Sequence, residues 1–329
     1  MKKIVVFSLG GTISAVGKNR LDYKDYVSGI LTGEDLIKAL PEINEIADVT
    51  IVQIDNVSST AINLEHWIAL REKIHTYLDK YQYDGVVITH GTNTLEETAY
   101  FLHLTVNTNK PIVLTGAQRP FLALSSDAPI NLLHALRVAS DEKSKDLGVL
   151  VVLNGTISSA RTVTKTDTYA LDAFQSPNLG YLGFIEHDES IIYEQKPTRK
   201  HTIQSVLKDI SFKNIKDVAI LYSYAGTTGD LIHYVASSGK YAGIVMAGTG
   251  AGRFSPLEDE ALKYAEEQGL MIVRSSRVGR GRVLDIEHYS FLQAITADNL
   301  SPQKARILLM LALQRTKDIK EIQQIFDTH

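Results

Sequence analysis

Short runs of apolar, mostly β-branched residues alternate along the chain with longer stretches in which apolar residues recur at the helical period. The short runs predict strands and the longer stretches predict helices. In the N-terminal part, strands are expected at 3–9, 48–53, 85–89, 111–115 and 148–153, and helices at 32–40, 64–80, 94–104 and 126–139. Strands that are apolar nearly throughout are buried on both faces, so this alternation predicts an α/β fold with a mostly parallel sheet.

A polar stretch over residues 183–202 interrupts the alternation. It contains Pro197 and the charged sequences EHDES and KPTRKH, which predict a hairpin or an interdomain linker. Beyond it, strands are expected at 218–222, 243–247 and 271–274, and helices at 229–237, 256–268, 302–314 and 319–326. Domains usually hold about 100 to 200 residues. We therefore expect an N-terminal α/β domain over 1–190, a linker over 191–210 and a smaller C-terminal α/β domain over 211–329.

The composition excludes several kinds of function. The chain has no cysteine, which excludes disulfides, thiolate catalysis and zinc–thiolate sites. A net charge of −4 and the lack of a long basic run argue against nucleic acid as a partner. No apolar stretch reaches the ~18 residues of a membrane span, and the run at 4–7 is too short for a signal peptide. We therefore expect a soluble, cytoplasmic protein that acts away from membranes.

Hydroxyl-bearing turns follow two of the expected strands, at the sheet edge where parallel sheets bind ligands. Thr12 lies in SLGGTIS, in which two glycines allow a sharp turn, although a plain strand-to-helix turn explains this motif equally well. Thr92 lies in HGTNTLEET before a helix, where backbone N–H groups can stabilise an oxyanion. Thr94 and Glu97 in the same motif match a capping box, so we expect them to hold the helix and not the substrate.

A lysine follows the fifth expected strand. Lys165 lies among threonines in TVTKTDT, and a solvated surface charge is the ordinary interpretation of such a residue. Its position after a strand end, beside two threonine-bearing turns, favours a catalytic role. A hydroxyl needs a base to become a nucleophile, and a lysine can be that base when burial or nearby charge lowers its pKa. Tyr26 is a second candidate to orient or deprotonate Thr12. The spacing alone does not single out this arrangement.

These motifs resemble the bacterial-type L-asparaginase family over nearly the whole chain. In chain order they are GGTI, HGTNTLEET, GAQRP, TVTKT, SSRVGRG and SPQKARILLMLAL. The resemblance implies a two-domain asparaginase-like fold and hydrolysis of the side-chain amide of asparagine to the carboxylate and ammonia. It implies no metal and no organic cofactor. It also implies a homotetramer of intimate dimers, in which the neighbouring subunit completes each active site.

The resemblance also implies roles for individual residues. Thr12 would attack the amide carbon, aided by Tyr26, and water would hydrolyse the resulting acyl-enzyme. Thr92 and Lys165 would move protons and activate that water. The backbone around Thr92 and Ala117 would hold the oxyanion.

The chain departs from the family pattern where the α-amino group of the substrate binds. Asn93 stands in place of an aspartate, and Thr60 stands in place of a glutamine after the retained Ser59, which aligns with the serine for the α-carboxylate. Two further positions belong to the partner-subunit part of the site. Arg253 aligns with an asparagine, and a glutamate of the family aligns near Glu287.

Together these changes remove negative charge and add positive charge where an ammonium should bind. We therefore expect the chemistry to be kept and the substrate to be altered, for example to an α-N-substituted asparagine or a dicarboxylic monoamide. Arg253 would then bind an added carboxylate or hydroxyls, although a surface arginine at a dimer interface explains it equally well. Two alternatives stay open: hydrolysis of free L-asparagine, and a non-catalytic ligand-binding homologue, which Asn93 favours and the four catalytic side chains oppose.

Overall fold

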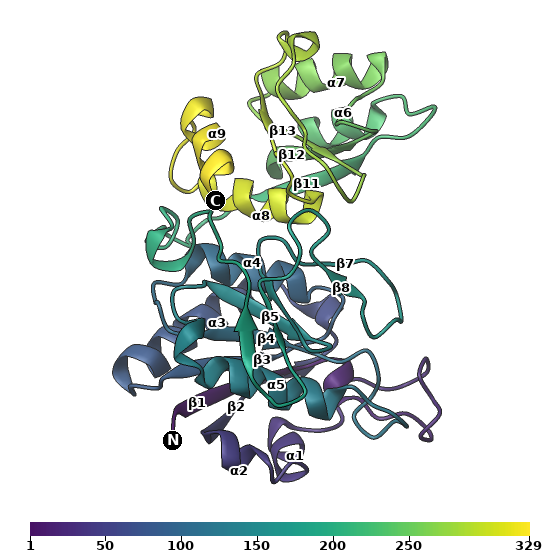
Figure 1. Cartoon of the computed structure of the whole chain (residues 1–329). Coiled ribbons are helices and arrows are strands. Elements are labelled where there is room, and N and C mark those ends of the chain that lie inside the picture. Colours follow the sequence, from purple (N-terminus) through teal and green to yellow (C-terminus); the bar gives the residue numbers. More distant parts are fainter. The chain divides into compact units, whose positions relative to one another are not determined.

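An eight-stranded sheet forms the centre of the first of two units into which the chain divides. The fold is that of a computed structural model, which describes residues 1–329. The first unit spans Met1–Gln204 and the second spans Ser205–His329. Each unit contains one main sheet with helices packed against it (Figure 1).

The sheet of the first unit has the strand order β10-β9-β6-β5-β4-β3-β1-β2. Its parallel part consists of β1 (Lys3–Gly10), β2 (Asp48–Val57), β3 (Gly85–Thr89), β4 (Ile112–Thr115) and β5 (Val149–Leu153). The antiparallel part consists of β6 (Thr156–Ser159), β9 (Gly183–Ile185) and β10 (Ile191–Tyr193). The polar stretch at 183–202 therefore begins with a hairpin that extends the sheet. A separate short ribbon pairs β7 (Thr164–Lys165) with β8 (Phe174–Gln175).

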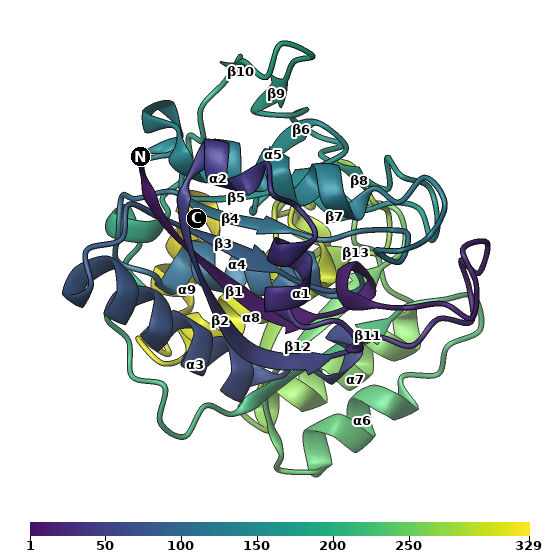
Figure 2. The same cartoon turned by 90° about the horizontal axis from the view of Figure 1, so that it is seen from below.

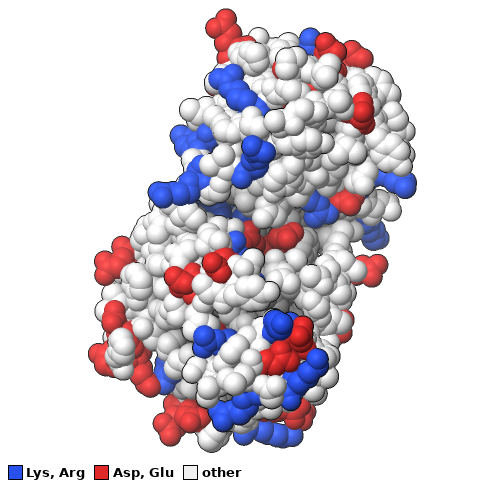
Figure 3. Space-filling view, turned by 90° about the vertical axis from the view of Figure 1, so that its right-hand side faces the viewer, with Lys and Arg blue, Asp and Glu red and all other residues white.

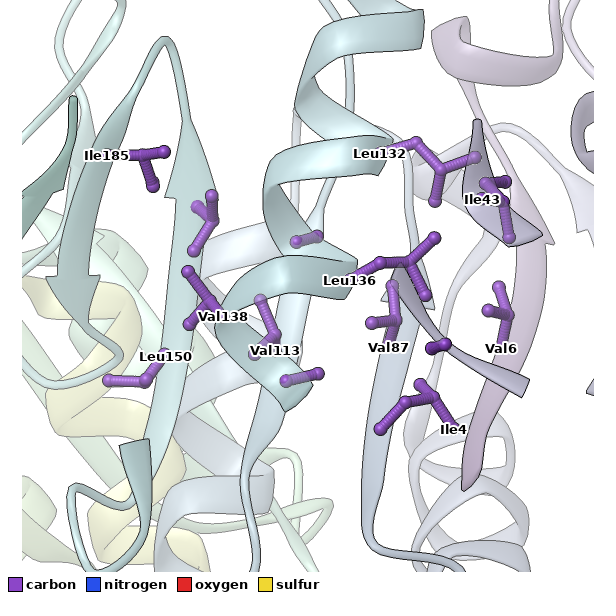
Figure 4. Close-up of a cluster of buried hydrophobic side chains, with 14 of the residues drawn as sticks. Ile4, Val6, Ile43, Val87, Val113, Leu132, Leu136, Val138, Leu150 and Ile185 are labelled. Atoms are coloured by element: carbon purple, nitrogen blue, oxygen red, sulfur yellow. The ribbon is translucent and has the colours of Figure 1, made fainter. Parts of the chain in front are cut away.

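Helices cover both faces of this sheet (Figure 2). One face carries α1 (Gly33–Lys38), α2 (Ile43–Ile46) and α5 (Ala128–Ser140), and the other carries α3 (Leu64–His75) and α4 (Leu95–Thr105). Alternate residues of each strand point to opposite faces. Figure 4 accordingly shows Leu132 and Leu136 of α5 packed against strand residues such as Val6 and Val87.

Short helical turns complete the first unit. The 3-10 turns cover Thr12–Ser14, Ser59–Ala61, Glu142–Ser144 and Thr202–Gln204, and a π-helical turn at Thr76–Lys80 extends α3. Two of them, at Thr12 and Ser59, directly follow strands β1 and β2. These turns therefore place hydroxyl side chains at the carboxyl edge of the parallel sheet.

The second unit contains a smaller, fully parallel sheet in the order β11-β12-β13-β14. Its strands are β11 (Asp217–Tyr222), β12 (Tyr241–Gly248), β13 (Met271–Ser276) and β14 (Ala294–Thr296). Its helices are α6 (Asp230–Ser237), α7 (Pro256–Glu267), α8 (Pro302–Ala312) and α9 (Ile319–Thr328), and a 3-10 turn covers Glu287–Tyr289. The fold class expected from the sequence, a larger N-terminal unit with a mostly parallel sheet and a smaller α/β unit, is confirmed.

Surface and helix properties agree with the composition. Acidic and basic side chains both occur on the visible face of each unit (Figure 3), as the similar numbers of acidic (38) and basic (34) residues lead one to expect. None of the helices combines the length and the apolar character that crossing a membrane requires.

Candidate active site

The turns that follow β1 and β3 are in backbone contact. Gly10 and Gly11 have φ values of 98° and 86°, which lie in the region that favours glycine. A Cβ on Gly11 would lie only 2.2 Å from the Cα of Gly91, so no larger residue fits there. This close approach brings the segment of Thr12 against the segment of Thr92, as parallel strands that end at one sheet edge allow.

Thr12 forms a hydrogen-bonded pair with a tyrosine. Its Oγ1 lies 3.0 Å from the hydroxyl oxygen of Tyr26. Thr12 is buried, with 8% of its surface exposed, and Tyr26 is half-buried. Tyr26 belongs to the segment between β1 and α1, where the backbones of Val16 and Val27 form an antiparallel bridge. The bridge fixes the segment next to Tyr26 and so helps to hold the tyrosine against the Thr12 turn.

Thr92 forms a second pair, with the lysine of β7. Lys165 Nζ donates to Thr92 Oγ1 at 2.8 Å and lies 3.4 Å from Asn93 Oδ1. Burial lowers the pKa of Lys165, and the negative charge of Asp167 partly opposes this by raising it. The neutral amine, which can accept a proton, is therefore more abundant than for a lysine in water.

Glu96 holds the strand that bears Lys165, a role that the sequence interpretation missed. One carboxylate oxygen accepts the backbone N–H of Lys165 at 2.7 Å, and the other accepts the hydroxyl of Thr164 at 3.1 Å. Glu96 is only 5% exposed. The sequence carried no signal for this role, because the two partners of Glu96 lie 68 and 69 positions away in the chain.

Thr94 does not cap helix α4 with its side chain. Its hydroxyl instead donates to the backbone carbonyl of Ser59 at 2.7 Å, and no side-chain cap hydrogen bond is present. Thr94 is the N-cap residue, as expected, but the side-chain bond that a capping box requires of it is absent, because its hydroxyl binds a carbonyl of the segment after β2. This bond ties the Ser59 turn to the start of α4.

The segment after β4 adjoins the Thr92 turn. A Cβ on Gly116 would lie 2.6 Å from the carbonyl oxygen of His90 and 3.3 Å from the Cγ2 of Thr92. Ala117, the next residue, is fully buried. The backbone of this segment therefore runs directly beside the second threonine, where the sequence placed part of an oxyanion site.

Asp127 and Asn131 fix the backbone around Ala117. The Asp127 carboxylate accepts the backbone N–H groups of Gln118 and Arg119, both at 2.9 Å. The side-chain amide of Asn131 donates to the carbonyl of Gly116 at 3.0 Å. Both side chains are almost fully buried. They act on the loop from behind, from the N-terminal part of α5, and the sequence did not identify them as part of the site.

The residues expected to bind the substrate fall into two groups. Ser59 is 3% exposed, and its Oγ lies 2.8 Å from the position of a Cβ on Gly91. Thr60 and Asn93 are exposed, and the Thr60 hydroxyl lies 3.0 Å from the hydroxyl of Ser58. These residues, like the four catalytic candidates and Ala117, belong to the first unit.

Arg253 and Glu287 lie in the second unit, and both are exposed. Their segments are linked by Arg274, which is 1% exposed and donates to the carbonyls of Gly252 and Leu284 at 3.4 and 3.3 Å. The guanidinium carbon of Arg274 also lies 3.9 Å from the ring centre of Tyr289. One buried cation thus connects the two segments. In neither unit are three or more His, Cys, Asp or Glu side chains grouped so that they could hold a metal ion.

Comparisons with known proteins find relatives along the whole chain. The family model for the asparaginase N-terminal domain matches residues 3–199, and the model for the glutaminase/asparaginase C-terminal domain matches residues 217–326. The chain is 40% identical over 329 residues to L-asparaginase 2 of Bacillus subtilis (strain 168), covering 100% of this chain and 87% of the relative. It is 41% identical over 332 residues to a probable periplasmic L-asparaginase of Haemophilus influenzae, covering 99% of this chain and 93% of the relative.

A solved structure is similar over the whole length. The probable cytoplasmic L-asparaginase of Campylobacter jejuni superposes with a TM-score of 0.95 at 39% identity, covering 100% of both chains. The fold and site therefore define an amidohydrolase with hydroxyl nucleophile candidates at the edge of a parallel sheet. The chain belongs to the asparaginase family, so the family expected from the sequence is confirmed.

Proposed function

We propose that this protein hydrolyses the side-chain amide of asparagine or an asparagine derivative through a threonine acyl-enzyme. The observation that carries the proposal is the pairing of two threonines with two proton-transfer partners at one sheet edge. Thr12 lies 3.0 Å from the Tyr26 hydroxyl, and Thr92 lies 2.8 Å from the Lys165 amine. The two threonine turns touch at Gly11 and Gly91. The names of the relatives support the same chemistry.

In the first half-reaction, Thr12 Oγ1 forms a bond to the amide carbon. Its proton passes to Tyr26 while the tyrosine hydroxyl donates its own proton to the amide nitrogen, so the leaving group is ammonia. The carbonyl oxygen becomes an oxyanion that backbone N–H groups near Thr92 and Ala117 stabilise. The product is an ester between the substrate acyl group and Thr12.

In the second half-reaction, water hydrolyses this ester. The neutral amine of Lys165 removes a proton from the water through the Thr92 hydroxyl, and the hydroxide attacks the ester carbon. The bond to Thr12 breaks, and the proton returns to Thr12 Oγ1. The lowered pKa of Lys165, which burial causes, supports this role because it increases the neutral fraction.

The substrate pocket favours a ligand whose α-nitrogen is substituted or missing. Asn93 presents a neutral amide 3.4 Å from Lys165 Nζ, where the family resemblance implies a carboxylate. Thr60 is too short to replace a glutamine and bonds to Ser58 instead. We propose that Ser59 still binds the carboxylate of the substrate, while Arg253 and Glu287 contribute from the partner subunit. A free α-ammonium would then lack a full counter-charge from Asn93.

A substrate comparison tests both levels of the proposal. Ammonia release is measured with L-asparagine, L-glutamine, α-N-acetyl-L-asparagine and succinamic acid. We expect the last two to give the higher kcat/KM values. A large preference for free asparagine would contradict the altered pocket while leaving the acyl-enzyme chemistry intact. Ligand binding with no turnover of any amide would favour the alternative of a non-catalytic ligand-binding homologue.

Asn93→Asp is the matched variant for this test. It restores a carboxylate of nearly the same size, and a hydrogen bond to a charged group is worth about 1.5 to 3 kcal/mol. We expect kcat/KM for free asparagine to rise about tenfold or more and that for succinamic acid, which has no α-amino group, to change little. An equal change in kcat/KM for both substrates would show that Asn93 does not contact the α-amino group.

We further propose a homotetramer of intimate dimers and a cytoplasmic location. The tetramer would let the exposed Arg253 and Glu287 complete the site of a neighbouring subunit. Light scattering coupled to size exclusion tests the assembly, for which we expect four times the chain mass of 36.4 kDa.

The name of the Campylobacter jejuni structure supports a cytoplasmic location, whereas the name of the Haemophilus influenzae relative, a probable periplasmic enzyme, opposes it. Fractionation of the native host tests the location.

A further inference from the structure

Lys165, the proposed proton acceptor of the candidate site, lies on a strand of only two residues. Lys165 lies on β7, Thr164–Lys165, which pairs only with the equally short β8. So short a ribbon fixes its own position weakly, because isolated two-stranded ribbons are marginally stable. The 2.8 Å hydrogen bond between Lys165 Nζ and Thr92 Oγ1 nevertheless requires a defined place for the lysine.

Glu96 supplies the missing restraint. Its carboxylate accepts the Lys165 backbone N–H at 2.7 Å and the Thr164 hydroxyl at 3.1 Å, so each oxygen holds one residue of β7. These bonds cross 69 and 68 positions of the chain. Glu96 lies in the first turn of α4, and the two acceptors of the lysine amine, Thr92 and Asn93, lie in the turn just before that helix. One helix therefore sets the position of both partners in the lysine–threonine pair.

The direction of these bonds matters for the chemistry. Both go to the strand itself, to a backbone N–H and a hydroxyl, and neither goes to the lysine amine. A carboxylate paired directly with the amine would favour its protonated form. Glu96 instead holds the strand and leaves the amine directed at Thr92, where its half-buried environment lowers its pKa.

We propose that Glu96 is a positioning residue that clamps β7 to α4 and thereby sets the distance between Lys165 and Thr92. This inference rests on the proposed role of Lys165. It predicts that the geometry of the carboxylate matters more than its charge. A glutamine can keep both bonds, since its carbonyl oxygen can accept the Lys165 N–H and its NH₂ can donate to the Thr164 hydroxyl.

Three variants with one control test the clamp. Glu96→Ala removes both bonds, Glu96→Gln keeps the geometry without the charge, and Thr164→Val removes one bond. Lys110→Met is the control, because Lys110 also makes two side-chain hydrogen bonds, to the carbonyls of Leu78 and Tyr83 at 2.8 Å. Lys110 precedes β4 and so lies at the amino ends of the parallel strands, away from the candidate site. Each variant is assayed below its melting temperature with the best amide substrate of the wild type.

We expect Glu96→Ala to lower kcat about 100-fold, since a shift of about 1 Å in a catalytic group has an effect of that order. The KM of Glu96→Ala should change less than about threefold. The kcat of Glu96→Gln should stay within about fivefold of the wild-type value, and the kcat of Thr164→Val should lie between those of Glu96→Gln and Glu96→Ala. Lys110→Met should lower only the melting temperature. The proposal is overturned if Glu96→Ala behaves like the control, or if Glu96→Gln loses as much kcat as Glu96→Ala.

A second readout does not need turnover. Acetic anhydride labelling of Lys165, followed by peptide mass spectrometry across pH, reports the pKa of its amine. Release of β7 in Glu96→Ala should expose the amine and move the labelling midpoint to higher pH, while Glu96→Gln should leave it in place. An unchanged midpoint in Glu96→Ala would overturn the clamp. If the wild type turns over no amide, the proposed function fails, yet this measurement still decides the clamp.

Discussion

Thr12 is the residue at which the proposed covalent chemistry can be separated from the fold. Its hydroxyl makes one hydrogen bond, to Tyr26, from a turn whose shape is set by glycine backbone contacts. We expect Thr12→Ala to lower kcat by at least about 1,000-fold, because the proposed ester forms on Thr12 Oγ1. The loss of stability should be about 1 kcal/mol or less. Ammonia release and thermal melting check the two parts, and retained turnover in a folded variant would exclude Thr12 as the nucleophile.

Lys165 gives the pH dependence of the reaction. The amine accepts a proton only in its neutral form, so kcat, which includes hydrolysis of the acyl-enzyme, should rise with pH as the lysine loses its proton. Burial places the midpoint of this rise below the ordinary lysine value of 10.5, since it lowers the pKa of Lys165. The measurement is kcat from about pH 6 to about pH 10 for the wild type and Lys165→Met. If the rate of Lys165→Met also rose with pH and had the same midpoint, the titrating group would be another residue.

At the scale of elements, His90 connects the end of β3 to two helices. Its Nδ1 lies 2.7 Å from the carbonyl oxygen of Gly91, which can only accept, so Nδ1 carries the proton. Its Nε2 lies 2.9 Å from the hydroxyl of Thr98 on α4 and accepts from it when the ring is neutral. The Thr98 oxygen in turn accepts the indole N–H of Trp67 on α3 at 2.8 Å. Burial favours the neutral histidine, in which all three of these hydrogen bonds are made.

Acid should therefore weaken the first unit through His90. Burial lowers the pKa of His90 from 6.5 to about 4. As the pH falls between these values, the unfolded chain binds a proton that the folded chain does not, so the free energy of unfolding decreases. The loss from this residue should total about 3 kcal/mol. His90→Gln should be less stable at neutral pH but lose less on acidification. Denaturant unfolding at both ends of the range measures this, and equal losses in both proteins would contradict it.

The elements that the sequence predicted well are those whose signal is local. Strand β3 has the expected bounds, because the β-branched run from Val86 to Ile88 is bounded closely by glycine and polar residues. Strand β2 continues to Val57, beyond the expected end at residue 53, because Val57 pairs with Gly10 of β1. Strands β6, β7, β8 and β14 were missed, since segments of two to four residues are too short to show a periodicity.

The candidate site divides in the same way. Glycine-rich turns after apolar strands indicate Thr12 and Thr92 from the sequence alone, and the folded chain brings both turns into contact. Glu96 could not be found from the sequence, because its partner is a backbone N–H 69 positions away, which no side-chain motif encodes. The side-chain partner of Thr94 was predicted wrongly for the opposite reason. A local capping pattern was present, but a distant carbonyl binds the hydroxyl.

At the scale of the whole molecule, the proposed sharing of sites between subunits can be tested by mixing two variants. Thr12→Ala removes the nucleophile from the first unit, and Arg253→Glu reverses a charge in the second unit. If the second unit of each chain serves the site of its partner, a mixed dimer contains one site with both defects and one intact site. If each chain completes its own site, a mixed dimer contains no intact site.

The two variants are purified separately, unfolded together in equal amounts and refolded, and ammonia release is compared with wild type treated alike. Random pairing makes half of the dimers mixed, so sharing predicts about a quarter of the wild-type activity from two nearly inactive parents. Activity no higher than that of the parents would place Arg253 in the site of its own chain. Full activity of Arg253→Glu alone would remove Arg253 from the site altogether and leave the altered pocket resting on Asn93 and Thr60.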